Sequence, residues 1–219
     1  MPTAPLTLAS ASPRRKELLE RVGFHVKVVP AGIDEQRFEG EPPEDFTKRM
    51  ARAKVQAAVR RLRATIYPSD AEGGRVNSLA SARDDLARWV IGADTVVVVD
   101  DVVLGKPAEL QEAREMLLRL SGRVHRVVTG FNLFDLRRNK EGLQAVATQV
   151  RFKHLSRAEI DKYVSVGESM DKAGGYAAQG VGAYLIEDLS GSYTNVVGLP
   201  LCQVIEMMEE MGATEILPF

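Results

Sequence analysis

Cysteine and histidine are scarce in this sequence. Its single cysteine, Cys202, excludes an intramolecular disulfide and a zinc site built from cysteines. The three histidines, His25, His125 and His154, are far apart in the chain, which argues against a histidine metal cage. A chain without a disulfide framework is suited to a reducing compartment. We therefore expect a cytoplasmic protein whose site is built from other residue types.

Long apolar runs and an excess of one charge are also absent. No stretch reaches the length of a transmembrane helix, and residues 1–10 lack the basic region and apolar core of a signal peptide. The formal net charge of -1 gives no long-range attraction toward nucleic acid or membranes, and there is no basic stripe with interleaved aromatic residues. The sequence therefore predicts neither a nucleic-acid partner nor a membrane partner, and a site for an anion must be local.

A Walker A motif, a dinucleotide fingerprint and internal repeats are missing as well. What the sequence contains is an alternation of strand and helix patterns. Strands are predicted at Leu6–Ala9, Phe24–Val29, Val90–Val99, Val102–Leu104, Val124–Phe134, Leu143–Phe152 and Tyr184–Leu189. Helices are predicted from Pro13 to Gly23, from Pro42-Pro43 to about Leu62, at Glu109–Leu120, from a Ser156 cap to Val164, and at Leu199–Met211.

This alternation includes at least two hairpins, so the fold class is α/β with a mixed sheet. The 219 residues, 45% of them hydrophobic, suffice for one large core or two closely packed lobes. Residues from about Thr65 to Arg88 have the composition of a loop and are predicted to form a surface insertion.

The stretch around Asp94 combines an apolar strand with charged residues. Val90–Val99 is almost entirely β-branched, which is typical of a strand buried on both faces, and Asp94 lies within it. A buried carboxylate needs a partner or a task. Asp100-Asp101 is predicted to turn the chain, so that Lys106, just past the returning strand, faces the same cleft as Asp94. The alternative is a structural aspartate held by backbone amides.

A second candidate site lies at the start of the first helix. Ser12 is a suitable N-cap and Pro13 a suitable first helical residue, and Ser10, Arg14 and Arg15 surround them. Hydroxyl groups, free backbone N–H groups, the helix dipole and two guanidinium groups together favour an anion such as phosphate. The alternative is an ordinary solvated basic helix turn. Arg15, like Lys106, is expected to be an exposed cation whose loss weakens binding more than stability.

Single residues elsewhere carry weaker signals. Glu35 lies in an acidic loop that can hold a divalent cation, although most such loops are only solvated. Lys54 lies on a predicted helix, where lysines are usually solvated. Lys172 and Gln179 are the main functional groups of the segment SMDKAGGYAAQGVG, in which two glycines allow a ligand to approach the backbone closely.

Six segments, taken in order, resemble the motifs of the Maf family and cover the chain from Leu8 to about Met211. They are Leu8-Ala9-Ser10-Ala11-Ser12-Pro13-Arg14-Arg15, Gly92-Ala93-Asp94-Thr95, Gly105-Lys106-Pro107, Ser121-Gly122-Arg123-Val124-His125, Met170-Asp171-Lys172-Ala173-Gly174-Gly175-Tyr176 and Val197-Gly198-Leu199-Pro200. The resemblance implies one domain over residues 1–219, with two lobes around a long twisted mixed sheet and a cleft between them. This fold is related to that of the inosine triphosphate pyrophosphatases.

The resemblance also implies an activity. A nucleoside triphosphate would be cut between its α- and β-phosphates with a divalent cation, Mg or Mn, giving monophosphate and pyrophosphate. Asp94 matches the proton acceptor of the family, and Arg14, Thr95 and Gln179 match the positions that sort substrates. Charged cleft positions are matched by Glu35, Lys54, Lys106 and Lys172, with Glu35 and Asp94 near the metal. A homodimer is expected from the family alone.

The residues fit this chemistry on their own terms. Attack at phosphorus requires the negative charges of a triphosphate to be neutralised. We expect Ser10, Ser12, Arg15, Lys54, Lys106 and Lys172 at the phosphates. The carboxylate of Asp94 is suited to take a proton from water. No cysteine or histidine is arranged as a nucleophile, which favours direct attack by water.

Three other functions compete with this one. A 7-methyl-GTP pyrophosphatase of the same family would carry an aromatic residue, Gln and Glu where this chain has Arg14, Thr95 and Gln179. Those three residues instead favour dTTP and UTP, including modified uridine triphosphates. A nucleotide-binding regulator of septum formation would have no need of the Asp94 base. A nucleic-acid-binding protein is disfavoured by the near-neutral charge.

Overall fold

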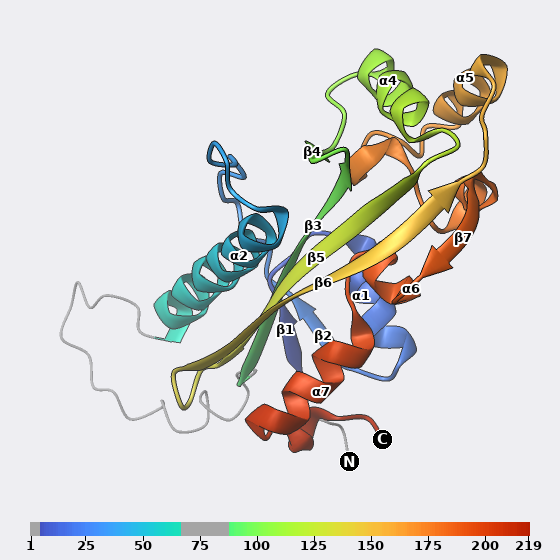
Figure 1. Ribbon diagram of the computed structural model, residues 1–219. Coiled ribbons are helices and arrows are strands. Elements are labelled where there is room, and N and C mark those ends of the chain that lie inside the picture. Colours follow the sequence, from blue (N-terminus) through green and yellow to red (C-terminus); the bar gives the residue numbers. More distant parts are fainter. Residues whose placement is uncertain (1–4, 67–87) are drawn as a thin grey trace, which may run out of the picture.

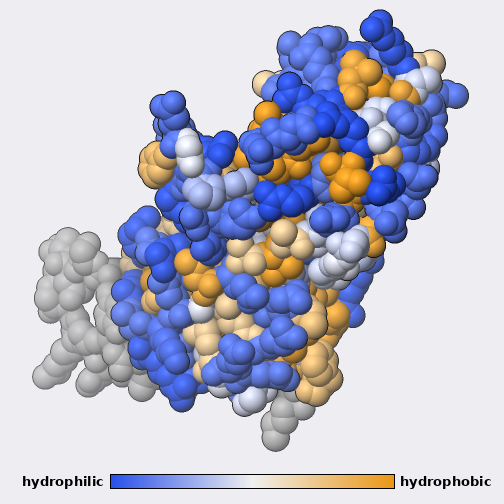
Figure 2. All heavy atoms as spheres, in the orientation of Figure 1, coloured by the Kyte–Doolittle hydropathy of each residue, from blue (hydrophilic) through white to orange (hydrophobic). Residues whose placement is uncertain are grey.

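The computed structural model describes residues 5–66 and 88–219. The predicted surface insertion from about Thr65 to Arg88 lies almost entirely outside the described residues. Among the described helices, none combines the length and the apolar character needed to cross a bilayer. On the face seen in Figure 2, hydrophobic residues appear in separate small areas among hydrophilic ones.

The described strands form one seven-stranded mixed sheet, which confirms the predicted α/β class. Its order is β2-β1-β3-β5-β6-β7, with β4 paired to β3 (Figure 1). β1 is parallel to β2 and β3, and all other pairs are antiparallel. The strands are β1 (Leu6–Leu8), β2 (Val26–Val28), β3 (Trp89–Val99), β4 (Val102–Leu104), β5 (Val124–Asp135), β6 (Lys140–Phe152) and β7 (Ile186–Ser190).

Helices pack on both faces of this sheet (Figure 1). They are α1 (Pro13–Arg21), α2 (Pro43–Ile66), α4 (Leu110–Leu120), α5 (Arg157–Ser165), α6 (Tyr193–Val197) and α7 (Leu201–Met211). α1 and α7 cover one face through a core that includes Leu19, Ile91 and Met208. α4 and α5 cover the far end of the sheet in a second core. α2 lies on the opposite face from α1.

Two predicted boundaries near the C-terminus are wrong. The strand expected from Tyr184 begins at Ile186, because Gly180–Leu185 forms a 3-10 helix. Gly182 lies so close to Ala177 that a Cβ would come within 2.4 Å of its carbonyl oxygen, so glycine fits here where a larger residue would not. The last helix begins at Leu201 rather than Leu199, since a residue that precedes proline avoids the helical region. The short helix α6 was not predicted.

β3 is left without a strand neighbour along part of one edge. β1 pairs with Val90 and Ile91, and β4 pairs with Val97–Val99. Among the described residues, no strand covers Gly92–Val96 on that side. The chain also reverses its direction across the sheet here, because β1 leads outward to β2 and the chain then returns to β3. Ligands of open α/β sheets bind at such switch points, beyond the carboxyl ends of the strands.

Two glycines let α2 approach this part of the sheet closely. A Cβ on Gly92 would lie 2.8 Å from a methyl group of Val55, and a Cβ on Gly130 would lie 2.3 Å from the carbonyl carbon of Thr47. Phe46 of α2 packs on the sheet in the same region, against Val96 and Val128. The close contact brings side chains of α2 within reach of the middle of β3.

Replacing Gly130 with alanine should destabilise the protein. The new methyl group would collide with the backbone of α2, which cannot rotate away as a side chain can, so we expect a loss of about 1–3 kcal/mol. Urea denaturation measures this loss. Gly32→Ala is the matched control, because a Cβ added at Gly32 would have no neighbouring atom within 4 Å. Equal stability of the two variants would contradict the close helix contact.

Candidate active site

Two pockets meet at the uncovered edge of β3. Successive residues of a strand point to opposite faces, so Asp94 and Thr95 open onto different pockets. The Asp94 pocket has a volume of about 260 Å³ and the Thr95 pocket about 80 Å³. Arg14, Lys106 and Asp171 line both of them. The two pockets therefore form one continuous candidate site.

In the Asp94 pocket, a buried lysine lies between two carboxylates. Lys54 Nζ is 2.6 Å from Asp94 Oδ1 and 2.7 Å from Glu35 Oε1. The Lys54 side chain is only 9% exposed, so the expectation that it is solvated is wrong. Within the described residues, the Asp94 carboxylate is held by Lys54 and not by backbone amides, which is the contact that the alternative required. The close approach of α2 at Gly92 and Gly130 explains why this lysine reaches β3.

The two carboxylates suit a hard divalent cation. Burial raises the pKa of Glu35, but its hydrogen bond and attraction to Lys54, together with Lys106 and Arg15, lower the pKa overall. Glu35 is therefore ionised at neutral pH. No group of three or more His, Cys, Asp or Glu residues forms a metal cage in the described part of the chain. A pair of carboxylates fits Mg²⁺, which takes its other ligands from substrate phosphates and water.

The turn from β1 into α1 forms one wall of the Asp94 pocket. Ser10 is buried, and its Oγ accepts hydrogen bonds from Ser12 N at 3.2 Å and from Arg15 Nη1 at 3.1 Å. Ser12 occupies the N-cap position and Pro13 follows it, as predicted. The Ser12 side chain, however, makes no cap hydrogen bond, so it lines the pocket without binding the helix.

The two arginines of α1 have different environments. Arg15 is only 9% exposed, which contradicts its predicted exposure. Its Nε donates to Gly198 O at 2.8 Å, and its Nη2 donates to Thr95 Oγ1 at 3.0 Å. Burial lowers the pKa of Arg15 against the attraction of Asp94, but a guanidinium stays charged in proteins. Arg14 instead forms a 2.9 Å ion pair with Asp171 at the mouth of both pockets.

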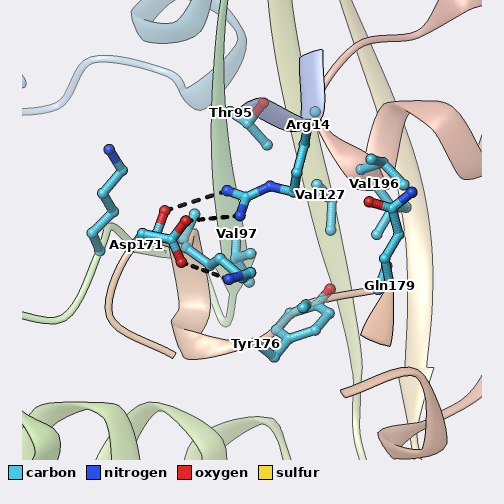
Figure 3. Close-up of a pocket in the computed structure, with 15 residues that line it drawn as sticks. Arg14, Thr95, Val97, Val127, Asp171, Tyr176, Gln179 and Val196 are labelled. Carbon is cyan, nitrogen blue, oxygen red and sulfur yellow. Dashed lines mark hydrogen bonds and ion pairs between the residues drawn. The ribbon is translucent and has the colours of Figure 1, made fainter. Parts of the chain in front are cut away.

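The three residues assigned to substrate choice line one pocket. Arg14, Thr95 and Gln179 surround the Thr95 pocket, whose apolar wall includes Val97, Val127 and Val196 (Figure 3). Among the residues the structure describes, the Gln179 amide has no hydrogen-bond partner. A pocket that combines an apolar wall with the Gln179 amide and the Thr95 hydroxyl suits a planar base that carries a few polar edges.

The remaining predicted lysines lie at the rim. Lys106 is exposed, as expected, and lines both pockets. Lys172 Nζ donates to Glu168 O at 2.6 Å and to Asp171 Oδ1 at 2.5 Å. Asp171 thus joins Arg14 to Lys172 (Figure 3). Burial raises the pKa of Asp171, but its bonds to Lys172 and Arg14 lower it overall.

Sequence reasoning missed Asp171 and Tyr176 as members of the site. An acid beside a lysine in a segment of small residues was the available signal for Asp171. Tyr176 forms part of the floor of the Thr95 pocket, and its hydroxyl lies 2.8 Å from His125 Nε2. His125 is 1% exposed, and burial lowers its pKa to about 4. The histidine is neutral at physiological pH.

This buried histidine should make the stability depend on pH. Below about pH 6.5 the unfolded chain protonates His125, whereas the folded protein does so only near pH 4, so stability falls as the pH falls through that window. The expected loss between pH 7 and pH 4 is about 3 kcal/mol. His125→Gln should remove that part of the loss in urea titrations at several pH values. His25→Gln, at an exposed histidine, should retain it. If the free energy of unfolding fell with pH to the same extent in both variants, His125 would not be the group responsible for the loss.

Comparisons with known proteins give one family and one name for the relatives described here. The family described as "Maf-like protein" matches residues 5–211. A "dTTP/UTP pyrophosphatase" of Geobacter sp. (strain M21) is 44% identical over 213 residues, which cover 97% of this chain and 98% of that relative. Proteins with the same name are 44% identical in Geotalea uraniireducens (strain Rf4), over 96% of each chain, and 40% identical in Clostridioides difficile (strain 630), over 94% of each chain.

Proposed function

This chain belongs to the Maf family, and we propose that it is a hydrolase that cleaves dTTP and UTP to the monophosphate and pyrophosphate. The observation that carries this proposal is that two pockets form one continuous site at the uncovered edge of β3. One combines Asp94 with Lys54 and Glu35, and the other holds the residues assigned to substrate choice. The names of relatives that align over nearly their whole length support the same substrates.

The nucleotide would span the two pockets. Its triphosphate fits the Asp94 pocket, where Ser10, Ser12 and Lys106 lie on the wall or rim, and Lys172 adds charge from the neighbouring pocket. Its base fits the Thr95 pocket. Arg14 lies between the two and is therefore suited to the sugar–phosphate junction. Arg15 lines the Asp94 pocket and contributes charge there, with three of its five N–H groups already bound to Ser10, Thr95 and Gly198.

In the proposed reaction, water attacks the α-phosphorus directly and Asp94 accepts a proton from this water. The bond between the α-phosphorus and the pyrophosphate then breaks. The hydrogen bond from Lys54 orients the Asp94 carboxylate and leaves its second oxygen available for the water. Lys106 and Lys172 balance the negative charge that builds up on the departing pyrophosphate. A bound Mg²⁺ or Mn²⁺, held by Asp94 and Glu35, would neutralise phosphate charge and polarise the phosphorus centre.

Release of pyrophosphate from separate nucleotides tests this proposal. The protein is incubated with Mg²⁺ or Mn²⁺ and with dTTP, UTP, CTP, ATP, GTP or 7-methyl-GTP. We expect dTTP and UTP to be cleaved fastest. Binding of nucleotide without turnover would favour a regulator of septum formation instead. A preference for 7-methyl-GTP would contradict the assignment of Arg14, whose positive charge repels that cationic base.

Several further properties rest on the family and on composition. We propose a single catalytic domain over residues 1–219, with the cleft between two lobes, that acts in the cytoplasm on non-standard or excess nucleotides. A homodimer is likewise a proposal, which light scattering tests directly. No nucleic-acid or membrane partner is proposed, because the chain has a net charge of -1.

A further inference from the structure

Three connected hydrogen bonds, here called the relay, run behind the Thr95 pocket. Arg15 Nη2 donates to Thr95 Oγ1 at 3.0 Å, and Thr95 Oγ1 lies 2.9 Å from Thr129 Oγ1. Thr129 Oγ1 donates in turn to the backbone carbonyl of Asn195 at 3.1 Å. Thr95 and Thr129 are direct cross-strand neighbours in the β3–β5 pair, which places their hydroxyl groups together. Thr129 is completely buried.

The two end groups of the relay, Arg15 and the Asn195 carbonyl, determine which hydroxyl donates in each hydrogen bond. A guanidinium only donates and a carbonyl oxygen only accepts. If Thr129 gives its proton to Asn195 O, then Thr95 must give its own proton to Thr129, and all three contacts are hydrogen bonds. If Thr129 pointed its proton at Thr95 instead, the contact with Asn195 would be lost. The first arrangement makes one more hydrogen bond and is therefore favoured.

We propose that Thr129 is a positioning residue that makes the Thr95 hydroxyl an acceptor toward the base. With its proton given to Thr129 and one lone pair occupied by Arg15, the hydroxyl has a single lone pair left for a ligand. It therefore selects a base that offers an N–H group. This inference rests on the proposed function, because it concerns how the same pocket chooses among nucleotides.

An acceptor at Thr95 distinguishes the pyrimidines. Uracil and thymine carry a hydrogen on ring atom N3, whereas N3 of cytosine carries a lone pair. A lone pair facing Thr95 Oγ1 leaves both acceptors unpaired, and sites built to bind an N–H group reject ligands that lack it. The free amide of Gln179 can bind a neighbouring carbonyl of the base with its N–H. The relay thus favours UTP and dTTP over CTP.

Thr129→Val tests the relay, because valine has the same shape but cannot accept the Thr95 proton. The Thr95 hydroxyl is then free to turn its proton into the pocket and donate to cytosine. The Asn195 carbonyl keeps a hydrogen bond from Gly198 N at 3.0 Å, so no buried acceptor is orphaned. The readout is kcat/KM for UTP divided by kcat/KM for CTP, which a general loss of structure would not change.

Two controls accompany this variant. Thr129→Ser keeps the hydroxyl and should keep the wild-type ratio. Thr7→Val makes the same chemical change at another fully buried threonine, whose hydroxyl has no partner within the described residues. We expect the wild type to prefer UTP over CTP by at least about 10-fold, and Thr129→Val to reduce that ratio by about 10-fold.

The outcomes separate the relay from the function on which it rests. An unchanged ratio in folded Thr129→Val overturns the relay alone. Equal cleavage of UTP and CTP by the wild type overturns it even if the valine variant does not fold. A wild-type protein that releases no pyrophosphate from any nucleotide overturns the proposed function, and the relay with it. A lowered ratio in Thr129→Val with a normal ratio in Thr129→Ser supports the relay.

Discussion

Replacing Asp94 with asparagine should lower the turnover of dTTP and UTP by about 10²–10⁴-fold while the protein stays folded. Asparagine has the shape of aspartate and can still accept the hydrogen bond from Lys54, but it cannot take a proton from water. The buried Lys54 also keeps Glu35 as a charged partner at 2.7 Å. The change therefore removes the base without leaving an isolated buried charge, which is the situation that costs most stability.

The measurement is kcat with saturating Mg²⁺, together with the melting temperature. Asp101→Asn is the matched control, because Asp101 is exposed in the β3–β4 turn at φ 61°, a conformation that asparagine adopts readily. It should keep both activity and stability. Near-normal turnover in a folded Asp94→Asn protein would show that another group accepts the proton.

The second large effect concerns the base. Changing Arg14→Trp, Thr95→Gln and Gln179→Glu together should raise the ratio of kcat/KM for 7-methyl-GTP to that for UTP by about 100-fold or more. The substitution at Arg14 removes a cation that repels methylated guanine and supplies a ring that stacks on it. A carboxylate at position 179 attracts the positive charge and accepts hydrogen bonds from a guanine edge. All three positions line the same pocket, so their effects should not be additive.

Steady-state kinetics with both nucleotides measures this shift. Arg14→Lys is the control, because it keeps the cation and should leave the ratio low. The substitution at Thr95 also removes a partner of Arg15 and Thr129, so the triple variant is expected to be less stable than the wild type. A folded triple variant that still prefers UTP would contradict the role of these positions in substrate choice.

Local patterns in the sequence predicted most of the fold. The helix predicted at Glu109–Leu120 is present as α4, and its Ala113 and Leu117 are fully buried. The predicted Ser156 cap of α5 is present, with Ser156 Oγ accepting from Glu159 N at 3.3 Å. Asp100 and Asp101 turn the chain with positive φ angles of 49° and 61°. Each feature depends on residues close together in the chain, which is why its pattern can be read directly.

The connections within the site could not be predicted in this way. Lys54 meets Asp94 across 40 residues of sequence, and only the packing of α2 at two glycines brings them together. Arg14 and Asp171 are 157 residues apart. The pairing of Thr95 with Thr129 depends on strand register, which the amino-acid pattern of either strand alone does not determine.

The hydrogen bond from Arg15 to Gly198 joins residues that are 183 positions apart. A chain leaving the ribosome therefore cannot close the Thr95 pocket until Gly198 has been synthesised. In refolding, such a contact must also overcome the entropy of closing a very long loop, so it forms after the local hairpins. Secondary structure should return before activity does. During that interval the strands are already paired, but the nucleotide has no complete pocket to enter.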